Sequence, residues 1–378
     1  MTPRKALGVL ALLAFLAWAP IVHAQNSVEV APGYTAREAV LLPSAGGTTD
    51  LLLLSQPDSA PEAASLVEWL HLDHDGAVVS RLPIDIAARS TTGFSLQAAR
   101  LGNGEVALFA PSPFKASGAR TMLAGLLRLS AEGRVLHTAA LGHPSFADET
   151  YRKSPDSVLY ANAVVPAPDG TLALVGVYGS DPYVPWWAHC TSDGTLIADG
   201  DELRPMPGPG VTGASFDADG SLRIVTESSQ RAQGQFDTVL HVYSPRGSLK
   251  EQPILAERGG ELTVSAFTAQ ELALIVREPK PAISFFTRTG QLLRSTPWTD
   301  PIPQRIIADG DGLAALESAD GKRNQILRID STGKIAWRSA PGLFLALARA
   351  PDGELRVLEL LTDAKGSHAR LRRLPAIR

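Results

Sequence analysis

Two interleaved series of tight turns run through this sequence and constrain its fold more than any other feature. One falls around Gly47, Gly104, Gly170, Gly220, Gln270, Gly312 and Gly353, and the other at Gly76, Gly133, Gly194, Gly247, Gly290 and Gly333. Each turn joins two short apolar or β-branched runs, and glycine suits such turns because it adopts positive φ at no steric cost. In the clearest copy, residues 161–166 and 171–176 flank Asp169-Gly170. The sequence therefore repeats a unit of four strands joined by two tight turns.

The spacing of the turns predicts how these units are arranged. The second series advances by about 40 to 60 residues per step, which is the range of a four-stranded propeller blade. We therefore predict an all-β, seven-bladed β-propeller. Two stacked β-sandwiches are the alternative, but they do not explain why both series of turns advance together. Only two strands follow Gly353, which gives the last blade three strands, so we expect the segment Ser27–Val30 to complete this blade and remove its open edges.

One copy of the repeat resembles a known family. Gln325–Arg338, with its turn Asp330-Ser331-Thr332-Gly333-Lys334 and with Trp337 in the following strand, resembles the repeat of pyrroloquinoline-quinone-type propellers. Weaker copies cover residues 127–136 and 285–293. The same repeat type occurs in the periplasmic scaffold lipoprotein of outer-membrane β-barrel assembly. The resemblance implies the propeller architecture and indicates little about activity.

The first 24 residues are typical of a secretory signal. Arg4 and Lys5 precede an apolar run over 6–19, and Val22-His23-Ala24 places small residues where a signal peptidase reads them. We expect cleavage after Ala24, a single mature domain over 25–378, a periplasmic or secreted location, and no direct membrane insertion after cleavage. An uncleaved anchor is the alternative. The single cysteine, Cys190, cannot pair internally and lies in an alternating run, so we expect it to be buried.

Charge and motifs argue against several classes of function. Lys and Arg number 35 against 39 Asp and Glu, which gives no electrostatic footprint for nucleic acid. Residues 208–213 fit G-x-G-x-x-G, but Pro209 and a following strand favour a linker over a dinucleotide site. His71 and His74 have no third zinc ligand at the usual spacing. We therefore expect no cofactor and no metal, and we favour a non-enzymatic role while leaving enzymatic activity open.

Three Asp-x-Asp-Gly segments look like fragments of calcium loops. They begin at Asp73, Asp217 and Asp309, and none has the third ligand and the bidentate Glu that such a loop requires. We expect the aspartates to cap backbone amides of tight turns instead.

Propellers that catalyse a reaction usually do so at the end of the ring opposite the tight turns, where the inner strands open onto the central channel. The sequence places Glu38, Asn162 and Arg305 at this channel mouth. Of these, only Glu38 and Asn162 could ligate a hard metal, which is too few for a calcium-dependent lactonase. A structural salt bridge is the alternative role for Arg305.

Two long loops at the same end are rich in aromatic residues, although Phe, Trp and Tyr make up only 6% of the chain. The binding candidates in and beside these loops are Tyr151, Arg152, Tyr178, Tyr183, Trp186 and Trp187. Tyr, Trp and Arg dominate the energetics of protein interfaces. The alternative is that Trp186 and Trp187 begin a strand and that one of them is buried between blades.

These features together favour an exported, non-enzymatic scaffold that binds another protein or a cell-envelope component and no nucleic acid. Two alternatives stay open. One is a hydrolase or lyase that acts on a sugar or lactone in the central channel. The other is a periplasmic protein that neutralises a toxin.

Overall fold

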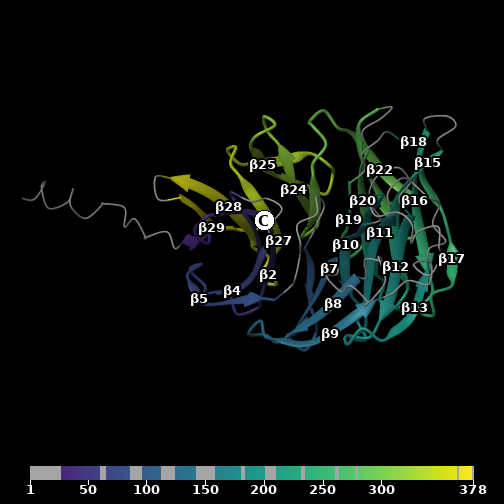
Figure 1. Ribbon diagram of the computed structural model, residues 1–378. Coiled ribbons are helices and arrows are strands. Elements are labelled where there is room, and N and C mark those ends of the chain that lie inside the picture. The colour runs from purple at the N-terminus through teal and green to yellow at the C-terminus, as the bar shows by residue number, and fades with distance from the viewer. Residues whose placement is uncertain are drawn as a thin grey trace, which may run out of the picture.

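The strands of this protein form seven antiparallel sheets arranged as the blades of a ring (Figure 1). The computed structural model describes residues 27–59, 65–85, 96–111, 124–141, 158–179, 184–200, 210–230, 235–259, 264–276, 280–363 and 366–376. In these ranges the regular elements are all strands, and no helix is long and apolar enough to cross a membrane.

Blades 1 to 3 follow one another along the chain, each with its four strands in sequence order. Blade 1 contains β2 (Tyr34–Pro43), β3 (Thr49–Pro57), β4 (Leu66–Leu72) and β5 (Val78–Ile84). Blade 2 contains β6 (Gln97–Arg100), β7 (Val106–Pro111), β8 (Ala124–Leu129) and β9 (Val135–Leu141). Blade 3 contains β10 (Val158–Pro166), β11 (Leu172–Gly179), β12 (Val184–Cys190) and β13 (Leu196–Gly200).

Blades 4 to 6 repeat this order, with one additional strand in blade 4. Blade 4 contains β14 (Val211–Phe216), β15 (Leu222–Gln230), β16 (Gln235–Tyr243), β17 (Leu249–Glu251) and β18 (Ile254–Gly259), and β17 and β18 both pair with β16. Blade 5 contains β19 (Val264–Phe267), β20 (Glu271–Val276), β21 (Ala282–Thr287) and β22 (Leu292–Pro297). Blade 6 contains β23 (Arg305–Asp309), β24 (Gly312–Ser318), β25 (Asn324–Ile329) and β26 (Ile335–Arg338).

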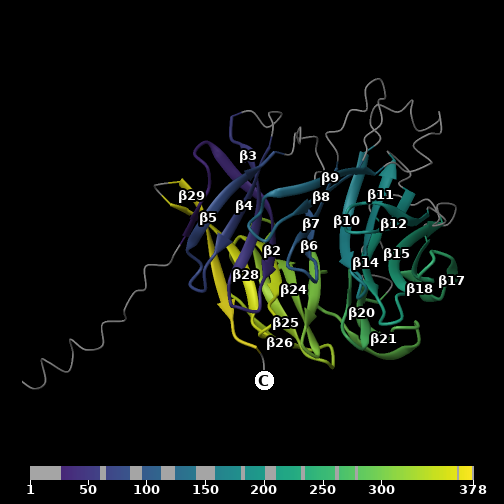
Figure 2. The same cartoon turned by 90° about the horizontal axis from the view of Figure 1, so that it is seen from below.

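Blade 7 joins the two ends of the chain, as the sequence predicted. It contains β27 (Phe344–Arg349), β28 (Leu355–Asp363), β29 (Gly366–Leu374) and, at its outer edge, β1 (Ser27–Glu29). β1 runs antiparallel to β29, with Val28 opposite Ala369, and both of these side chains are fully buried. The purple and yellow ends of the ribbon therefore lie side by side (Figure 2).

The seven inner strands surround the axis of the ring. Each contacts the inner strands of both neighbouring blades, which closes the circle β2, β6, β10, β14, β19, β23 and β27. The seven apolar clusters of the core each lie at one of the seven contacts between adjacent blades. The seven-bladed, all-β prediction is confirmed.

The predicted turns form as expected, with one adjustment. Every glycine of the second series has positive φ, between 83° and 90°. In blade 6 the first turn is a two-residue hairpin in which Asp309 faces Gly312, and its left-handed residue is Gly310 rather than Gly312. In blade 5 the first turn, from Thr268 to Glu271, forms without glycine.

Some second-series glycines also pack directly against the preceding blade. A Cβ on Gly133 of blade 2 would lie 2.2 Å from Cγ of Trp69 in β4 of blade 1. A Cβ on Gly247 of blade 4 would lie 2.9 Å from the ring of Trp187 in β12 of blade 3. Carbon atoms in contact normally stand about 3.5–4.0 Å apart, so at these two positions only glycine lets the neighbouring blades meet.

Candidate functional site

The structure removes two aromatic residues from the predicted binding surface. Trp186 and Trp187 both lie in β12 and are only 2% and 1% exposed. Trp186 packs between blades 2 and 3, with its ring centroid 6.0 Å from that of Phe109. Trp187 packs between blades 3 and 4, with its ring centroid 4.6 Å from that of Tyr243. Assigning them to a binding surface was therefore wrong: β12 begins before both, at Val184, and alternation directs the two indoles to opposite faces of the blade.

The other predicted binding residues lie largely beyond the described structure. Tyr151, Arg152 and Tyr183 fall outside the described residues. Tyr178 lies in β11, opposite Val184 of β12, and its side chain is not among those described. They stay predictions from the sequence.

The three residues predicted at the channel mouth all belong to inner strands near the end opposite the tight turns. Glu38 is in β2, Asn162 in β10 and Arg305 at the start of β23. Glu38 and Asn162 lie at bulges in their strands, where the pairing shifts by one residue. Bulges re-aim side chains and are common beside binding sites. The structure therefore places all three at the same end of the ring axis.

The environments of these three residues differ. The backbone N–H of Leu96 in blade 2 donates to Oε2 of Glu38 at 3.0 Å. The side-chain oxygen Oδ1 of Asn162 is buried and has no hydrogen-bond partner in the described part of the protein. Arg305 is accessible to water, yet desolvation by the surrounding protein lowers the pKa of its guanidinium, against the opposing effect of the Glu38 charge. A side chain that water reaches but protein surrounds fits a position facing the ring axis.

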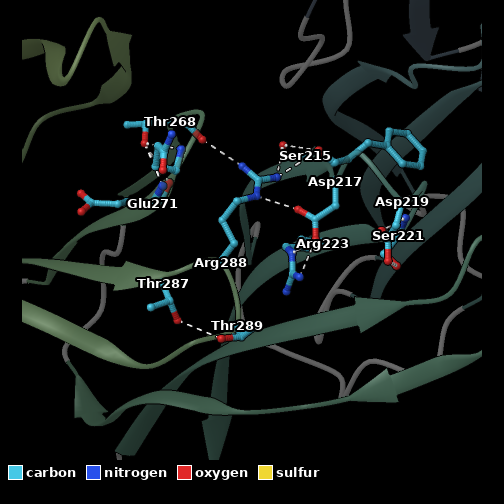
Figure 3. Close-up of polar contacts among 12 residues, drawn as sticks. Ser215, Asp217, Asp219, Ser221, Arg223, Thr268, Glu271, Thr287, Arg288 and Thr289 are labelled. Carbon is cyan, nitrogen blue, oxygen red and sulfur yellow. Dashed lines mark hydrogen bonds and ion pairs between the residues drawn. The ribbon is translucent and has the colours of Figure 1, made fainter.

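The tight-turn end of the ring carries a polar network that the sequence did not reveal (Figure 3). Asp217 in blade 4 accepts from Nε of Arg223 in its own blade and from Nε of Arg288 in blade 5, both at 2.6 Å. Arg288 also donates to the backbone oxygen of Thr268 at 2.9 Å and to Oγ of Ser215 at 2.8 Å. Burial opposes ionisation of Asp217, but the two arginines outweigh it and hold its pKa below the usual value. The network therefore joins blades 4 and 5, and its role is structural.

The aspartates of the calcium-like segments have other partners. Oδ1 of Asp73 accepts from the backbone N–H groups of Asp75 and Ala77 at 2.9 and 2.8 Å, which is the predicted capping of a turn. Asp309 instead lies 3.2 Å from Nε of Arg328. Across the described ranges, no group of three His, Cys, Asp or Glu side chains is placed to hold a metal ion.

Two buried groups are held in their neutral forms. Cys190 is fully buried, as predicted, and burial raises the pKa of its thiol to about 12. His241 in β16 is 2% exposed, and burial lowers its pKa to about 4. Nε2 of His241 lies 2.8 Å from Oγ1 of Thr226. Neither group is available to solvent as a nucleophile or a base.

Comparisons with known proteins agree on the fold and add no activity. No protein-family model and no curated protein matches the sequence. BamB from Moraxella catarrhalis matches at 14% identity and TM-score 0.43, covering 90% of this chain and 99% of that chain. A chain of a mitotic checkpoint complex matches at 13% identity and TM-score 0.55, covering 93% and 92%. An acylaminoacyl peptidase from Pyrococcus horikoshii matches at 10% identity and TM-score 0.53, covering 90% of this chain and 52% of the peptidase.

At these identities the similarities concern the fold alone. The repeat that resembles pyrroloquinoline-quinone-type propellers is now placed in the ring. It comprises β25, the turn at Gly333 and β26, the two outermost strands of blade 6.

Proposed function

We propose that this protein is an exported, non-enzymatic scaffold that binds another protein or a cell-envelope component through the loops opposite the tight turns. The observation that carries the proposal is the difference between the two ends of the ring. At one end, short turns and ion pairs such as the Asp217 network close the surface. At the other end, the chain leaves β9 at Leu141 and re-enters β10 only at Val158.

A second connection leaves from the same place. Val158 of β10 pairs with Gly179 of β11, and the chain then passes from Gly179 to Val184 of β12. The ends of the two connections therefore adjoin on blade 3. Their sequences contain Tyr151, Arg152 and Tyr183, which are residue types that contribute strongly to protein interfaces. A rigid ring that presents long loops is a common way to build a binding surface.

Photo-crosslinking in the native host tests this proposal. A photoreactive amino acid is placed at Tyr151 or Tyr183, and, as controls, at the exposed positions Leu292 and Trp337 on the outer strands of blades 5 and 6, which are 55% and 40% exposed. We expect a discrete crosslinked partner from the loop positions and none from the controls. The combined variant Tyr151→Ala, Arg152→Ala and Tyr183→Ala should lose this partner while it remains folded. Equal crosslinking at loop and control positions, or full retention by the triple variant, contradicts the proposal.

Export is tested separately, by cell fractionation and N-terminal sequencing of the mature protein. We expect a mature chain that begins at Gln25. The same crosslinked partner distinguishes a scaffold from the toxin-neutralising alternative, because its identity shows whether it is a toxin. Turnover of a sugar or lactone by the purified protein would favour the hydrolase alternative.

A further inference from the structure

The outermost strands of the blades carry features that hinder pairing with another chain. In blades 1 to 6, one extra residue near the start of the outermost strand makes a bulge in its pairing with the third strand. Bulges twist an edge away from an incoming strand, and charged residues or prolines on the edge hinder pairing further. The length and composition of the strand beyond its bulge therefore determine how open each edge is.

Six of the seven outer edges are short or carry such residues. In blade 1, β5 contains Arg81 and Pro83, and in blade 5, β22 contains Arg294 and Pro297. In blades 3 and 6 only three and two residues of the outer strand follow the bulge, and each set includes a charged residue. The edge of blade 4 consists of the two strands β17 and β18, and that of blade 7 of the three-residue β1, and each of these strands contains a glutamate.

The outer strand of blade 2, β9, lacks this protection. Val135–Leu141 contains no Asp, Glu, Lys, Arg or Pro, unlike every other outer strand in the described part of the chain. β9 pairs with β8 along its length, and beyond the bulge at Leu136 the pairing is regular over residues 137–141. No other described strand pairs with its outer edge, which runs along the rim of the ring (Figure 1). β9 is therefore the most open edge among the described strands.

The side chains of β9 leave this edge accessible from both faces. Val135 and Leu136 are 46% and 48% exposed. His137 and Thr138, which point to opposite faces of the strand, are also exposed. Ala139 is partly buried against the core cluster between blades 2 and 3, which holds the strand in place. A fixed, apolar edge with unpaired N–H and C=O groups is a template for another β-strand.

We propose that β9 pairs antiparallel with β9 of a second copy of this chain, so that two blades form one continuous sheet in a two-fold dimer. About a two-fold axis a strand meets its own sequence, so a charged residue near the axis approaches its own like charge. Pairing through β22 would bring two copies of Arg294 together, whereas pairing through β9 brings together uncharged residues alone. The closed pair also occupies both edges, which prevents further strands from adding. This inference does not rest on the proposed function, because it requires only β9 and its own copy.

Symmetry restricts how the two strands can meet. Hydrogen-bonded and non-hydrogen-bonded pairs alternate along an antiparallel ladder, so a two-fold axis places one residue opposite its own copy. The midpoint of the regular segment 137–141 is Ala139. With Ala139 on the axis, Thr138 lies opposite Ala140 of the second copy, and the two Thr138 residues lie on one face of the sheet, diagonally across the axis at about 7–8 Å. Long side chains at this position in the two copies can therefore interact.

Analytical ultracentrifugation of the purified, full mature protein tests the dimer. We expect a reversible equilibrium between monomer and dimer at concentrations up to about 100 μM. Thr138→Lys and Thr138→Glu should each weaken association at least tenfold, because each places two like charges across the axis. An equimolar mixture of these two variants should recover the dimer, because opposite charges then meet. Recovery in the mixture also shows that both variants are folded.

Two matched controls accompany these variants. Thr138→Val is uncharged and similar in size, so it should retain the dimer. Val79→Lys places a charge on the outer strand of blade 1, where Val79 is 63% exposed, and should leave association unchanged. A parent protein that stays monomeric over the whole concentration range overturns the proposal. So does a dimer that Thr138→Lys does not weaken, or one that Val79→Lys weakens as much, because the interface then lies elsewhere.

Discussion

The contact between Gly133 and Trp69 makes it possible to measure how much the packing between two blades contributes to stability, apart from the backbone strain of a turn. Gly133 has φ of 84° and is buried beneath the indole of Trp69, which is fully buried. Gly170 has φ of 85° in a turn of the same shape, is exposed, and has no atom within 4 Å of the position that a Cβ would take. Alanine substitution at the two positions therefore produces the same backbone strain and a different contact.

The magnitudes follow from these two environments. An alanine with left-handed backbone conformation destabilises the fold by about 1–2 kcal/mol. Because alanine lowers the conformational entropy of the unfolded chain relative to glycine, it also stabilises the fold by about 0.4–1 kcal/mol at both positions. Gly170→Ala should therefore lower the free energy of unfolding by about 1 kcal/mol. At Gly133 the new methyl group would also lie 2.2 Å from Cγ of Trp69, and overpacking of this kind adds about 1–3 kcal/mol. Gly133→Ala should therefore lose about 2–4 kcal/mol.

Urea unfolding followed by far-ultraviolet circular dichroism measures both losses. A double-mutant cycle with Trp69→Leu identifies the cause. In the Trp69→Leu background Gly133→Ala should lose only about 1 kcal/mol, because the smaller side chain leaves room for the methyl group. Equal losses for Gly133→Ala and Gly170→Ala would refute the packing argument, as would a loss at Gly133 that Trp69→Leu does not reduce.

Three other predictions follow from buried polar groups. Folding lowers the pKa of His241 from 6.5 to about 4, so between these values only the unfolded chain takes up the proton. The free energy of unfolding should therefore be unaffected by this group above pH 6.5 and should fall by about 3 kcal/mol as the pH is lowered to 4. In urea titrations over this range His241→Gln should flatten the decline, and an unchanged slope would assign the decline to other groups. Asp217→Asn should lower the free energy of unfolding by about 3–5 kcal/mol, because it leaves Arg223 buried without its charge partner. The control Asp75→Asn, on an exposed turn, should change the free energy of unfolding by less than about 0.5 kcal/mol. Similar effects of the two substitutions would contradict the structural role of the network. Cys190, with its thiol pKa raised to about 12, should react with a disulfide reagent at pH 8 only after the protein unfolds in urea, and rapid reaction of the native protein would show that the site opens.

Features set by neighbouring residues could be predicted from the sequence. The turn at Gly333 needs a residue that adopts positive φ. The glycine and the two β-rich runs that it joins lie within a few residues of one another, so the sequence alone indicates the turn. The partner of β1 could also be predicted, because counting strands left one vacancy in the last blade. The hairpin at Gly310 was placed two residues too late, since Asp309-Gly310-Asp311-Gly312 contains two glycines and either can occupy the turn.

Features set by contacts between blades could not be predicted in the same way. The burial of Trp187 depends on Tyr243 and Gly247 in the next blade, and nothing near Trp187 in the sequence indicates them. The network at Asp217 was missed for the same reason, because its partner Arg288 follows 71 residues later. The one local signal was the occurrence of an aspartate and an arginine, each in a tight turn, in successive units.

The pairing of β1 with β29 has a consequence for how the molecule is made. Ser27 pairs with Arg370, so the first strand to leave the ribosome must wait for almost the last one. At about 5–20 residues per second, that interval is roughly 20–70 s. Throughout it, both the N-terminal segment and the growing arc of blades carry unpaired hydrogen-bonding groups. A nascent chain of this kind becomes fully cooperative only after β29 has been synthesised, and a chain whose synthesis stops before β29 forms an arc instead of a ring.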